Sequence, residues 1–250
     1  MNGRLAGRTA LVTGAARPGS IGRAICAALA EEGADLAIND HGRAAEAEEF
    51  AGKMRALGVR AVPLEGDVTI VDECRALVDE AIRGLGHLDI LVNNAGFAQH
   101  KPFMQITEAD FDHSTSLHLK GPFFLAQFAA AHMLTRGFGR IVNISSEQAY
   151  IGYADLAHYT AAKGGLRTLT KSLALALGPT ITVNTVCPGP TATDKFKLGP
   201  EYRPEIRDQI VLKRWVEPRD VGRSVVFLVS EDGAAYTGQT LDPNCGSVMW

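Results

Sequence analysis

A tyrosine, a lysine and a serine have the types and the spacing of an acid/base site. Tyr159 and Lys163 lie four residues apart in YTAAK, a helix-compatible stretch, so their side chains would share one helix face. An ammonium group beside a phenol favours the phenolate, so we expect Lys163 to lower the pKa of Tyr159. Ser146 ends an apolar run and offers a hydroxyl that can orient a substrate oxygen. Together they predict proton transfer to or from an oxygen atom.

A glycine-rich loop near the start of the chain predicts a dinucleotide site. The loop TGAARPGSIGRA (13–24) follows the first apolar run, and Gly14, Gly19 and Gly22 give the spacing G-x4-G-x2-G. Glycines let backbone N–H groups approach phosphate closely, and a helix N-terminus adds a positive dipole. We expect Ser20 to contact the pyrophosphate through its hydroxyl or its N–H. A plain strand-to-helix turn is the alternative interpretation.

Two carboxylates follow the next two apolar runs. Asp40 can accept both hydroxyls of an adenine ribose and would repel a 2′-phosphate, which favours NAD over NADP. Arg17, His41 and Arg43 leave NADP as the less favoured alternative, since basic groups attract that phosphate. Asp67 can accept a hydrogen bond from the adenine amino group, although a simple cap at the end of a strand is the other interpretation.

Short apolar or β-branched runs alternate with helix-like stretches along the chain. The runs are TALV (9–12), ADLAIND (34–40), VRAVPLEGDV (59–68), LDILVNN (88–94), RIVNIS (140–145), ITVNTVCPG (181–189) and a weaker QTLDP (239–243). Between them, apolar residues recur at helical steps, and Gly33 and Gly58 are natural helix stops. We therefore expect one doubly wound α/β domain (Rossmann fold) over residues 1–250. It should contain a parallel sheet of about seven strands with helices on both faces.

The composition gives no reason to expect nucleic acid or a membrane as a partner. The net charge is −3, and Lys and Arg form no concentrated run. No window holds about 18 uninterrupted apolar residues, and the N-terminal segment lacks a secretion signal. The four cysteines are scattered without C-x-x-C spacing, which predicts reduced thiols and no metal site. We expect a cytoplasmic enzyme or binding protein.

Six motifs in chain order resemble the short-chain dehydrogenase/reductase family over essentially the whole chain. They are TGAAR…IGRA in the glycine-rich loop, GDV (66–68), NNAG (93–96), ISS…YTAAK (144–163), NTVCPGPTATD (184–194) and YTGQTLDPNCG (236–246). Ser146 lies thirteen residues before Tyr159, which matches the catalytic spacing of that family. The resemblance implies an oxidoreductase that uses a nicotinamide cofactor.

The resemblance also implies a role for each residue of the site. Tyr159 would exchange a proton with the substrate oxygen, Lys163 would depress its pKa and bind the nicotinamide ribose, and Ser146 would hold the carbonyl or alkoxide. Cofactor contacts are implied for Gly14, Arg17, Ser20, Ile21, Asp40, Asp67, Val68, Asn94, Ala95, Gly96, Tyr159, Lys163, Pro188, Gly189, Thr191 and Thr193. Substrate contacts fall to Ser146, Gln148, Tyr153 and Tyr159, with a lid around residues 194–213. The family further implies a homotetramer.

The sequence departs from the family pattern at two informative places. His118, in SLHLKG, stands where the family has an asparagine that holds a water linking the catalytic lysine to solvent. We expect His118 to do the same and to titrate near neutrality, and a merely packed histidine is the alternative. The lengthened glycine-rich loop resembles that of enoyl-thioester reductases. These enzymes separate tyrosine and lysine by six residues, whereas three lie between Tyr159 and Lys163, which favours carbonyl/alcohol chemistry.

The sequence thus predicts hydride transfer between a nicotinamide cofactor, NAD, and a small alcohol or ketone. Gln148 and Tyr153 can bind hydroxyls, which mildly favours a polyol or sugar, although ordinary loop chemistry also explains them. A 3-oxoacyl thioester is the second candidate substrate. From another class, a non-catalytic NAD-binding regulatory protein is the alternative, with turnover lost through His118.

Overall fold

Seven parallel strands form the centre of the computed structural model, which describes residues 3–194, 196 and 204–249. The strands are β1 (Thr9–Val12), β2 (Asp35–Asp40), β3 (Ala61–Glu65), β4 (Ile90–Asn93), β5 (Gly139–Ile144), β6 (Ile181–Val186) and β7 (Thr240–Leu241). Their order in the sheet is β3-β2-β1-β4-β5-β6-β7, and every pairing is parallel. The predicted doubly wound sheet is confirmed. The strand order reverses between β1 and β4, where such folds bind ligands.

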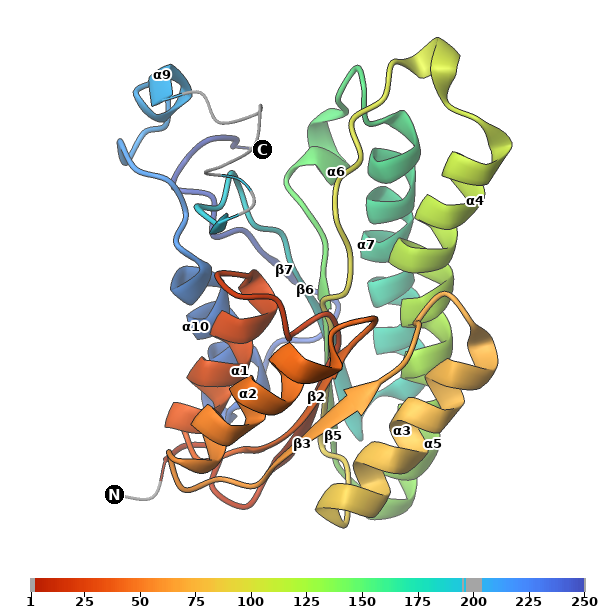
Figure 1. Cartoon of the computed structure of the whole chain (residues 1–250), viewed down its shortest axis with the longest axis vertical. Coiled ribbons are helices and arrows are strands. Elements are labelled where there is room, and N and C mark those ends of the chain that lie inside the picture. Colours follow the sequence, from red (N-terminus) through yellow and green to blue (C-terminus); the bar gives the residue numbers. More distant parts are fainter. Residues whose placement is uncertain (1–2, 195, 197–203, 250) are drawn as a thin grey trace.

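Helices cover both faces of the sheet, as the alternating sequence predicts (Figure 1). One layer consists of α1 (Ile21–Glu31), α2 (Ala44–Arg55) and α10 (Pro218–Val229). The other consists of α3 (Val71–Leu85), α4 (Glu108–Thr115), α5 (Gly121–Arg136) and α7 (Ala157–Leu177). Successive strand side chains point to opposite faces, so Val12 packs into the first core and Leu11 into the second. β1 is therefore apolar on both sides.

Short helices and turns lie among these elements. They are α6 (Gln148–Ile151), α9 (Pro204–Arg207), and the 3-10 turns Phe103–Gln105 and Glu231–Gly233. No helix in the described part of the chain is long and apolar enough to cross a membrane. Gly33, a predicted helix stop, lies just beyond α1 with φ +88°. Gly58, the other predicted stop, lies three residues beyond α2.

A π-helical turn, Ser116–Lys120, joins α4 to α5 and was not predicted. In this turn the N–H of Gly121 donates to the carbonyl of Ser116, five residues earlier. Pro122 follows and has no N–H to donate to the carbonyl of His118, so an ordinary α-helical ladder cannot run through this point. Such turns often occur at functional sites. Here the turn carries His118 into the protein interior.

The segment that follows β6 is anchored by a small apolar cluster. Ala192, Ile210 and Trp215 are buried together, and Phe196 and Ile206 pack against them. Residues 195 and 197–203 of the predicted lid lie outside the described residues. A lid function for 194–213 stays a prediction.

Candidate active site

Thr13 ties the loop after β1 to the loop after β4. Its hydroxyl oxygen accepts hydrogen bonds from the backbone N–H groups of Asn94 (3.1 Å) and Ala95 (3.0 Å). The Asn94 side chain donates in return to the carbonyls of Thr13 (2.8 Å) and Gly14 (3.0 Å). The two loops therefore border the crevice at the reversal of strand order as one unit.

Gly14 and Gly22 are required by close backbone contacts within this unit. Gly14 has φ +63°, and a Cβ added to it would lie 2.6 Å from Ala95 Cα. A Cβ on Gly22 would lie 2.4 Å from the Gly14 carbonyl oxygen. No side chain fits at either place, so the loop stays thin. A thin loop at a helix N-terminus exposes backbone N–H groups, as a bound phosphate requires.

Ser20 is the N-cap of α1. Its hydroxyl oxygen accepts a hydrogen bond from the N–H of Arg23 at 3.2 Å. The hydroxyl proton remains a donor, so the predicted contact between Ser20 and a pyrophosphate is compatible with the cap and stays a prediction. Ile21 is the first residue of α1 and is half-buried.

Asp40 lies at the end of β2 with its carboxylate against the glycine-rich loop. One oxygen accepts from the N–H of Ala16 at 2.7 Å, and the other from the N–H of His41 at 2.9 Å. A carboxylate offers roughly four acceptor positions, so capacity for ribose hydroxyls remains. The structure thus puts Asp40 at the predicted place beside the loop.

Asp67 forms the turn that ends β3. It accepts from the N–H of Thr69 at 2.9 Å, and its own N–H donates to Glu73 at 2.6 Å. Burial raises the pKa of Asp67, but the hydrogen bonds from Thr69 outweigh burial and leave that pKa below its ordinary value. The neighbouring Val68 is buried. The strand-end cap is therefore present, and adenine contacts by either residue stay predictions.

The three basic residues near Asp40 differ in whether they interact with a carboxylate. Arg43 donates to Glu46 at 2.9 Å, and His41 lies 3.6 Å from Glu65. Arg17 is exposed in the glycine-rich loop and makes no ion pair with any residue between 3 and 194 or between 204 and 249. Of these three residues, Arg17 is thus the one that no carboxylate in the described residues engages, and its contact with a cofactor stays a prediction.

The structure brings Ser146, Tyr159 and Lys163 together at the carboxyl end of β5. Ser146 follows this strand, and Tyr159 and Lys163 lie in the first two turns of α7. Tyr159 shares a hydrogen bond with Ser146, and Lys163 Nζ donates to the Ile144 carbonyl at 2.7 Å. All three are buried, with Lys163 only 4% exposed. The grouping predicted from spacing is present.

Burial reverses the predicted effect on Tyr159. It raises the pKa of Tyr159 to about 12, against the lowering effect of the hydrogen bond with Ser146. It also lowers the pKa of Lys163 to about 8. The prediction that Lys163 holds the pKa of Tyr159 below its ordinary value is wrong for this structure. Desolvation is the dominant effect, and the ammonium of Lys163, 5.8 Å from the ring centroid, does not offset it.

His118 lies directly beside Tyr159. The two rings meet edge to face, with centroids 5.0 Å apart. His118 Nε2 bonds to the Phe97 carbonyl at 3.1 Å, so this nitrogen carries the proton. A Cβ on Gly96 would lie 2.3 Å from His118 Cε1, and Gly96 has φ +151°. His118 therefore joins the loop after β4 to the tyrosine.

The predicted titration of His118 near neutrality is wrong. Burial, and then the positive charge of Lys163, hold the pKa of His118 well below its usual range. The side chain is 2% exposed, so a charged imidazole would lose nearly all its hydration. The ring therefore stays neutral at physiological pH. No hydrogen bond links it to Lys163 in the part of the chain described, and a water between them stays a prediction.

The residues expected near the nicotinamide lie in the loop after β6. Pro188 is buried, and the N–H of Gly189 donates to Pro243 at 3.2 Å. The Thr191 hydroxyl donates to the Gly189 carbonyl at 2.9 Å. Thr193 accepts from the N–H of Phe196 at 3.1 Å, at the start of the segment after β6. Cofactor contacts by these four predicted residues stay predictions.

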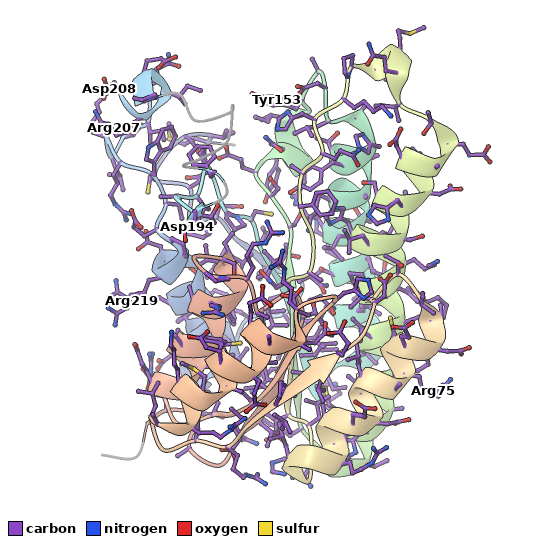
Figure 2. The ribbon with its side chains drawn as sticks, viewed as in Figure 1. Arg75, Tyr153, Asp194, Arg207, Asp208 and Arg219 are labelled. Atoms are coloured by element: carbon purple, nitrogen blue, oxygen red, sulfur yellow. The ribbon has the colours of Figure 1, made fainter. Side chains whose placement is uncertain are left out.

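Asp194 continues this loop onto the glycine-rich loop. Its N–H lies 3.4 Å from the Gly19 carbonyl, and a Cβ on Gly19 would fall 2.1 Å from its carboxylate. Figure 2 shows Asp194 above the N-terminal end of α1, and Tyr153 on the side of α6 and α7. The loop after β6 and the glycine-rich loop are thus in contact.

Glu147 was missed by the sequence reasoning. Its N–H donates to Pro188 at 3.1 Å and its carboxylate accepts from the Ser247 hydroxyl, so it ties the C-terminal segment to the loop after β6. Burial raises the pKa of Glu147, opposed by the hydrogen bond from Ser247. The one sequence feature that could have indicated Glu147 is its position, a charged residue directly after Ser146 at the end of an apolar strand.

The predicted substrate residues surround Ser146 unevenly. Gln148 is half-buried, and its N–H donates to the Ser146 hydroxyl at 3.2 Å. Tyr153 is 48% exposed, and its ring lies edge-on to His100. Ile151 and Phe97 are also exposed, by 53% and 45%. Apolar side chains thus accompany the hydroxyl and amide groups.

Comparison with known proteins agrees with this geometry. A family model described as enoyl-(acyl carrier protein) reductase matches residues 14–247. A 3-oxoacyl-[acyl-carrier-protein] reductase of Staphylococcus aureus is 38% identical over 244 residues, covering 97% of this chain and 98% of its own.

Two solved structures share the fold closely. A dehydrogenase/reductase from Sinorhizobium meliloti is 35% identical with a TM-score of 0.91, covering 98% of this chain and 96% of its own. A blue fluorescent protein from a metagenomic library, solved with NADPH, is 35% identical with a TM-score of 0.92. It covers 98% of this chain and 100% of its own. These similarities extend along the whole chain, across the glycine-rich loop and the Ser146, Tyr159 and Lys163 group.

Proposed function

The chain belongs to the short-chain dehydrogenase/reductase family, and on that basis we propose that it interconverts an alcohol and a ketone with Tyr159 as acid and base. The observation that carries the proposal is the buried group of Ser146, Tyr159 and Lys163. It lies beside the cofactor cradle, by which we mean the glycine-rich loop after β1 and the loop after β4 that is hydrogen-bonded to it. Proton transfer at an oxygen atom is the chemistry that these side chains can perform.

The cradle fits a nicotinamide dinucleotide, which would supply or accept the hydride. Gly14 and Gly22 leave a loop in which a Cβ would fill the space, and α1 begins directly behind it. Asp40 would hold the adenine ribose. Asn94 and Ala95, fixed by Thr13, would line the adenosine side, with Pro188 and Gly189 at the nicotinamide end.

In the reducing direction, Tyr159 donates its proton to the substrate oxygen. Its pKa of about 12 keeps it a neutral phenol, which is the form that holds this proton. The Ser146 hydroxyl hydrogen-bonds the same oxygen and limits where it lies. In the oxidising direction, Tyr159 must first lose its own proton, and the resulting phenolate, stabilised by Lys163, then accepts the proton of the alcohol.

Lys163 stabilises the phenolate that Tyr159 becomes after donating. Its pKa of about 8 leaves it mostly an ammonium at neutral pH. Its Nζ is held by the Ile144 carbonyl, so the positive charge stays fixed near the ring. A fixed charge in a buried site stabilises developing negative charge without reorganisation.

We propose NAD as the preferred cofactor. The Asp40 carboxylate is anchored to the glycine-rich loop at Ala16, where it would repel a 2′-phosphate. NADP is the second candidate, because Arg17 is exposed in that loop and a solved structure similar to this chain holds NADPH. The ratio of kcat/KM values for the two cofactors decides between them.

A small ketone or secondary alcohol on a partly apolar skeleton is the proposed substrate, with a polyol or sugar included. Gln148 donates to Ser146 and shares α6 with the exposed Ile151, and Phe97 and Tyr153 are also exposed. A 3-oxoacyl thioester is the second candidate, favoured by the 38% identity to the Staphylococcus aureus reductase. Enoyl reduction is disfavoured by the short spacing between Tyr159 and Lys163. A homotetramer and a cytoplasmic location stay predictions from the family resemblance.

A substrate panel with both cofactors tests the proposal. We expect absorbance changes at the nicotinamide band with alcohols, ketones or 3-oxoacyl thioesters, and a loss of about 10³-fold in kcat in Tyr159→Phe. Cofactor binding should persist in that variant. Tight cofactor binding with no turnover on any substrate would instead support the non-catalytic regulatory alternative.

A further inference from the structure

A small polar pocket behind Tyr159 is not used by the proposed reaction. It has a volume of about 10 Å³, and Ser114, His118, His158 and Tyr159 are among the residues that line it. Ser114 belongs to α4, His118 to the π-helical turn, and His158 directly precedes Tyr159 in α7. The pocket therefore lies where α4, the π-helical turn and α7 meet.

Three atoms of these residues have no hydrogen-bond partner among residues 3–194, 196 and 204–249. They are Ser114 Oγ, His118 Nδ1 and His158 Nδ1. The three side chains are only 6%, 2% and 2% exposed, so bulk water does not reach them freely. Leaving a buried polar atom unpaired is costly, so three such atoms around one pocket indicate a shared partner.

The size and chemistry of the pocket fit one neutral oxygen. A cavity of about this size accommodates a single water, which needs roughly two to four polar partners. His118 Nδ1 is an acceptor, because Nε2 carries the proton that bonds to Phe97, and Ser114 can both donate and accept. No group of three or more His, Cys, Asp or Glu side chains that could hold a metal was found in the described ranges.

We propose that this pocket binds one ordered water shared by Ser114, His118 and His158, and that Ser114 and His158 are positioning residues for Tyr159. The water joins α4 and the π-helical turn to α7 at the residue next to Tyr159. It also fixes the His118 ring, whose edge-to-face contact with Tyr159 sets the tilt of the phenol. The role in orientation rests on the proposed function of Tyr159, whereas the water site does not.

A crystal structure at atomic resolution tests the site directly. We expect one oxygen within hydrogen-bond distance of Ser114 Oγ and of Nδ1 of both histidines. A dry pocket, or protein partners for all three atoms, overturns the proposal. In Ser114→Ala the oxygen should lose occupancy or shift.

Kinetics test the positioning role. Ser114→Ala should lower kcat about tenfold while the KM values for substrate and cofactor change less than about twofold. Ser114→Thr, which keeps a hydroxyl, should recover most of that loss, and His158→Gln should lose less than His158→Leu. Ser172→Ala, an exposed serine on α7, is the matched control. An unchanged kcat in Ser114→Ala and His158→Leu overturns the positioning role.

Tyr159→Phe separates the two failures. If it keeps the parent rate, the proposed function fails, and the water seen in the crystal still stands. If Tyr159→Phe is inactive while Ser114→Ala and His158→Leu match the parent, only the positioning role fails.

Discussion

The cofactor cradle and the catalytic pocket lie on neighbouring strands but are built differently. The cradle is shaped mainly by glycines and backbone groups, such as Gly14, which lies against Ala95 and accepts a hydrogen bond from Asn94. In the catalytic pocket, buried side chains such as Lys163 and His118 decide the chemistry. Cofactor binding in the cradle therefore depends on the absence of side chains, whereas proton transfer in the catalytic pocket depends on how burial shifts the pKa values. Substitutions should therefore affect the two regions in different ways.

Removing the buried charge should give the largest effect. We expect Lys163→Met to lower kcat about 10³-fold, because the phenolate of Tyr159 loses its stabilising cation. Cofactor affinity should change less than kcat, since only the predicted contact of Lys163 with the nicotinamide ribose is lost and the glycine-rich loop is untouched. Stopped-flow kinetics and a cofactor titration separate the two quantities. Equal losses in both would contradict the division between the regions.

A side chain added to the cradle should lower cofactor affinity more than kcat. Gly14→Val should weaken cofactor binding about 10²-fold, because its φ is +63° and its Cβ would lie 2.6 Å from Ala95 Cα. Binding calorimetry gives the affinity, and thermal unfolding reports the accompanying strain. Gly52→Val is the control, since no atom lies within 4 Å of a Cβ there. A normal affinity in Gly14→Val would show that the loop is not the cradle.

Raising the pH should act on the pocket alone. Lys163 loses its proton above its pKa of about 8, so we expect kcat for reduction to fall about fivefold between pH 8 and pH 9. Tyr159, with a pKa of about 12, keeps its proton throughout this window and cannot cause the fall. Lys163→Arg, whose cation persists, should remove the fall from the pH profile. If the pH profile is unchanged in Lys163→Arg, the fall in kcat belongs to another titrating group.

The same pKa fixes how stability depends on pH. Between about pH 8 and the ordinary lysine value of 10.5, the unfolded chain binds a proton at Lys163 that the folded chain does not. The free energy of unfolding contributed by this group therefore rises with pH in that window. Denaturant titrations of the parent and of Lys163→Met across this range measure the difference.

Asp40 should have a smaller, selective effect. Asp40→Ala should move the ratio of kcat/KM for NAD over NADP toward NADP by about tenfold, because repulsion of the 2′-phosphate is lost. Glu65→Ala, at the end of the neighbouring strand, is the matched control for lost negative charge. If both variants shift the ratio equally, the general field and not Asp40 sets the preference.

His118 should give the smallest effect and sharpen the comparison. We expect His118→Asn to change kcat less than about threefold, because its amide N–H can donate to the Phe97 carbonyl as Nε2 does and its amide oxygen can accept from the proposed water as Nδ1 does. His118→Ala should lose more, since both of these hydrogen-bonding groups are lost. Neither variant should alter the pH profile, as the imidazole stays neutral. A shift of the profile in His118→Asn would restore His118 as a titrating group.

Much of this molecule was predictable from the sequence, and for a local reason. β1 is a continuous apolar run, β2 has an apolar centre (36–38) between polar ends, and α3 ends at Gly86, so residue type alone shows them. The grouping of Ser146 with Tyr159 and Lys163 was predicted from the spacing of Tyr159 and Lys163 on one helix face, from the position of Ser146 at a strand end, and from the family resemblance. Local patterns suffice where one segment determines its own structure.

The electrostatics could not be predicted, because burial is the sum of contacts from distant segments. The pKa of Tyr159 rises and that of Lys163 falls because other elements bury this part of α7. A local sequence motif does not show which elements will bury it. The π-helical turn and the pocket of Ser114 and His158 also require tertiary packing. Glu147 was visible in the sequence but has meaning only through Ser247, a hundred residues away.

The contact between Gly96 and His118 has an evolutionary consequence. A Cβ at position 96 would lie 2.3 Å from the imidazole, so the two positions are not free to vary independently. A lineage that carries histidine at 118 therefore keeps glycine at 96. A smaller side chain at 118 would remove this contact but not the φ of +151°, which disfavours any side chain at 96. Position 118 can therefore change while glycine is retained at 96, whereas position 96 is held by two separate constraints.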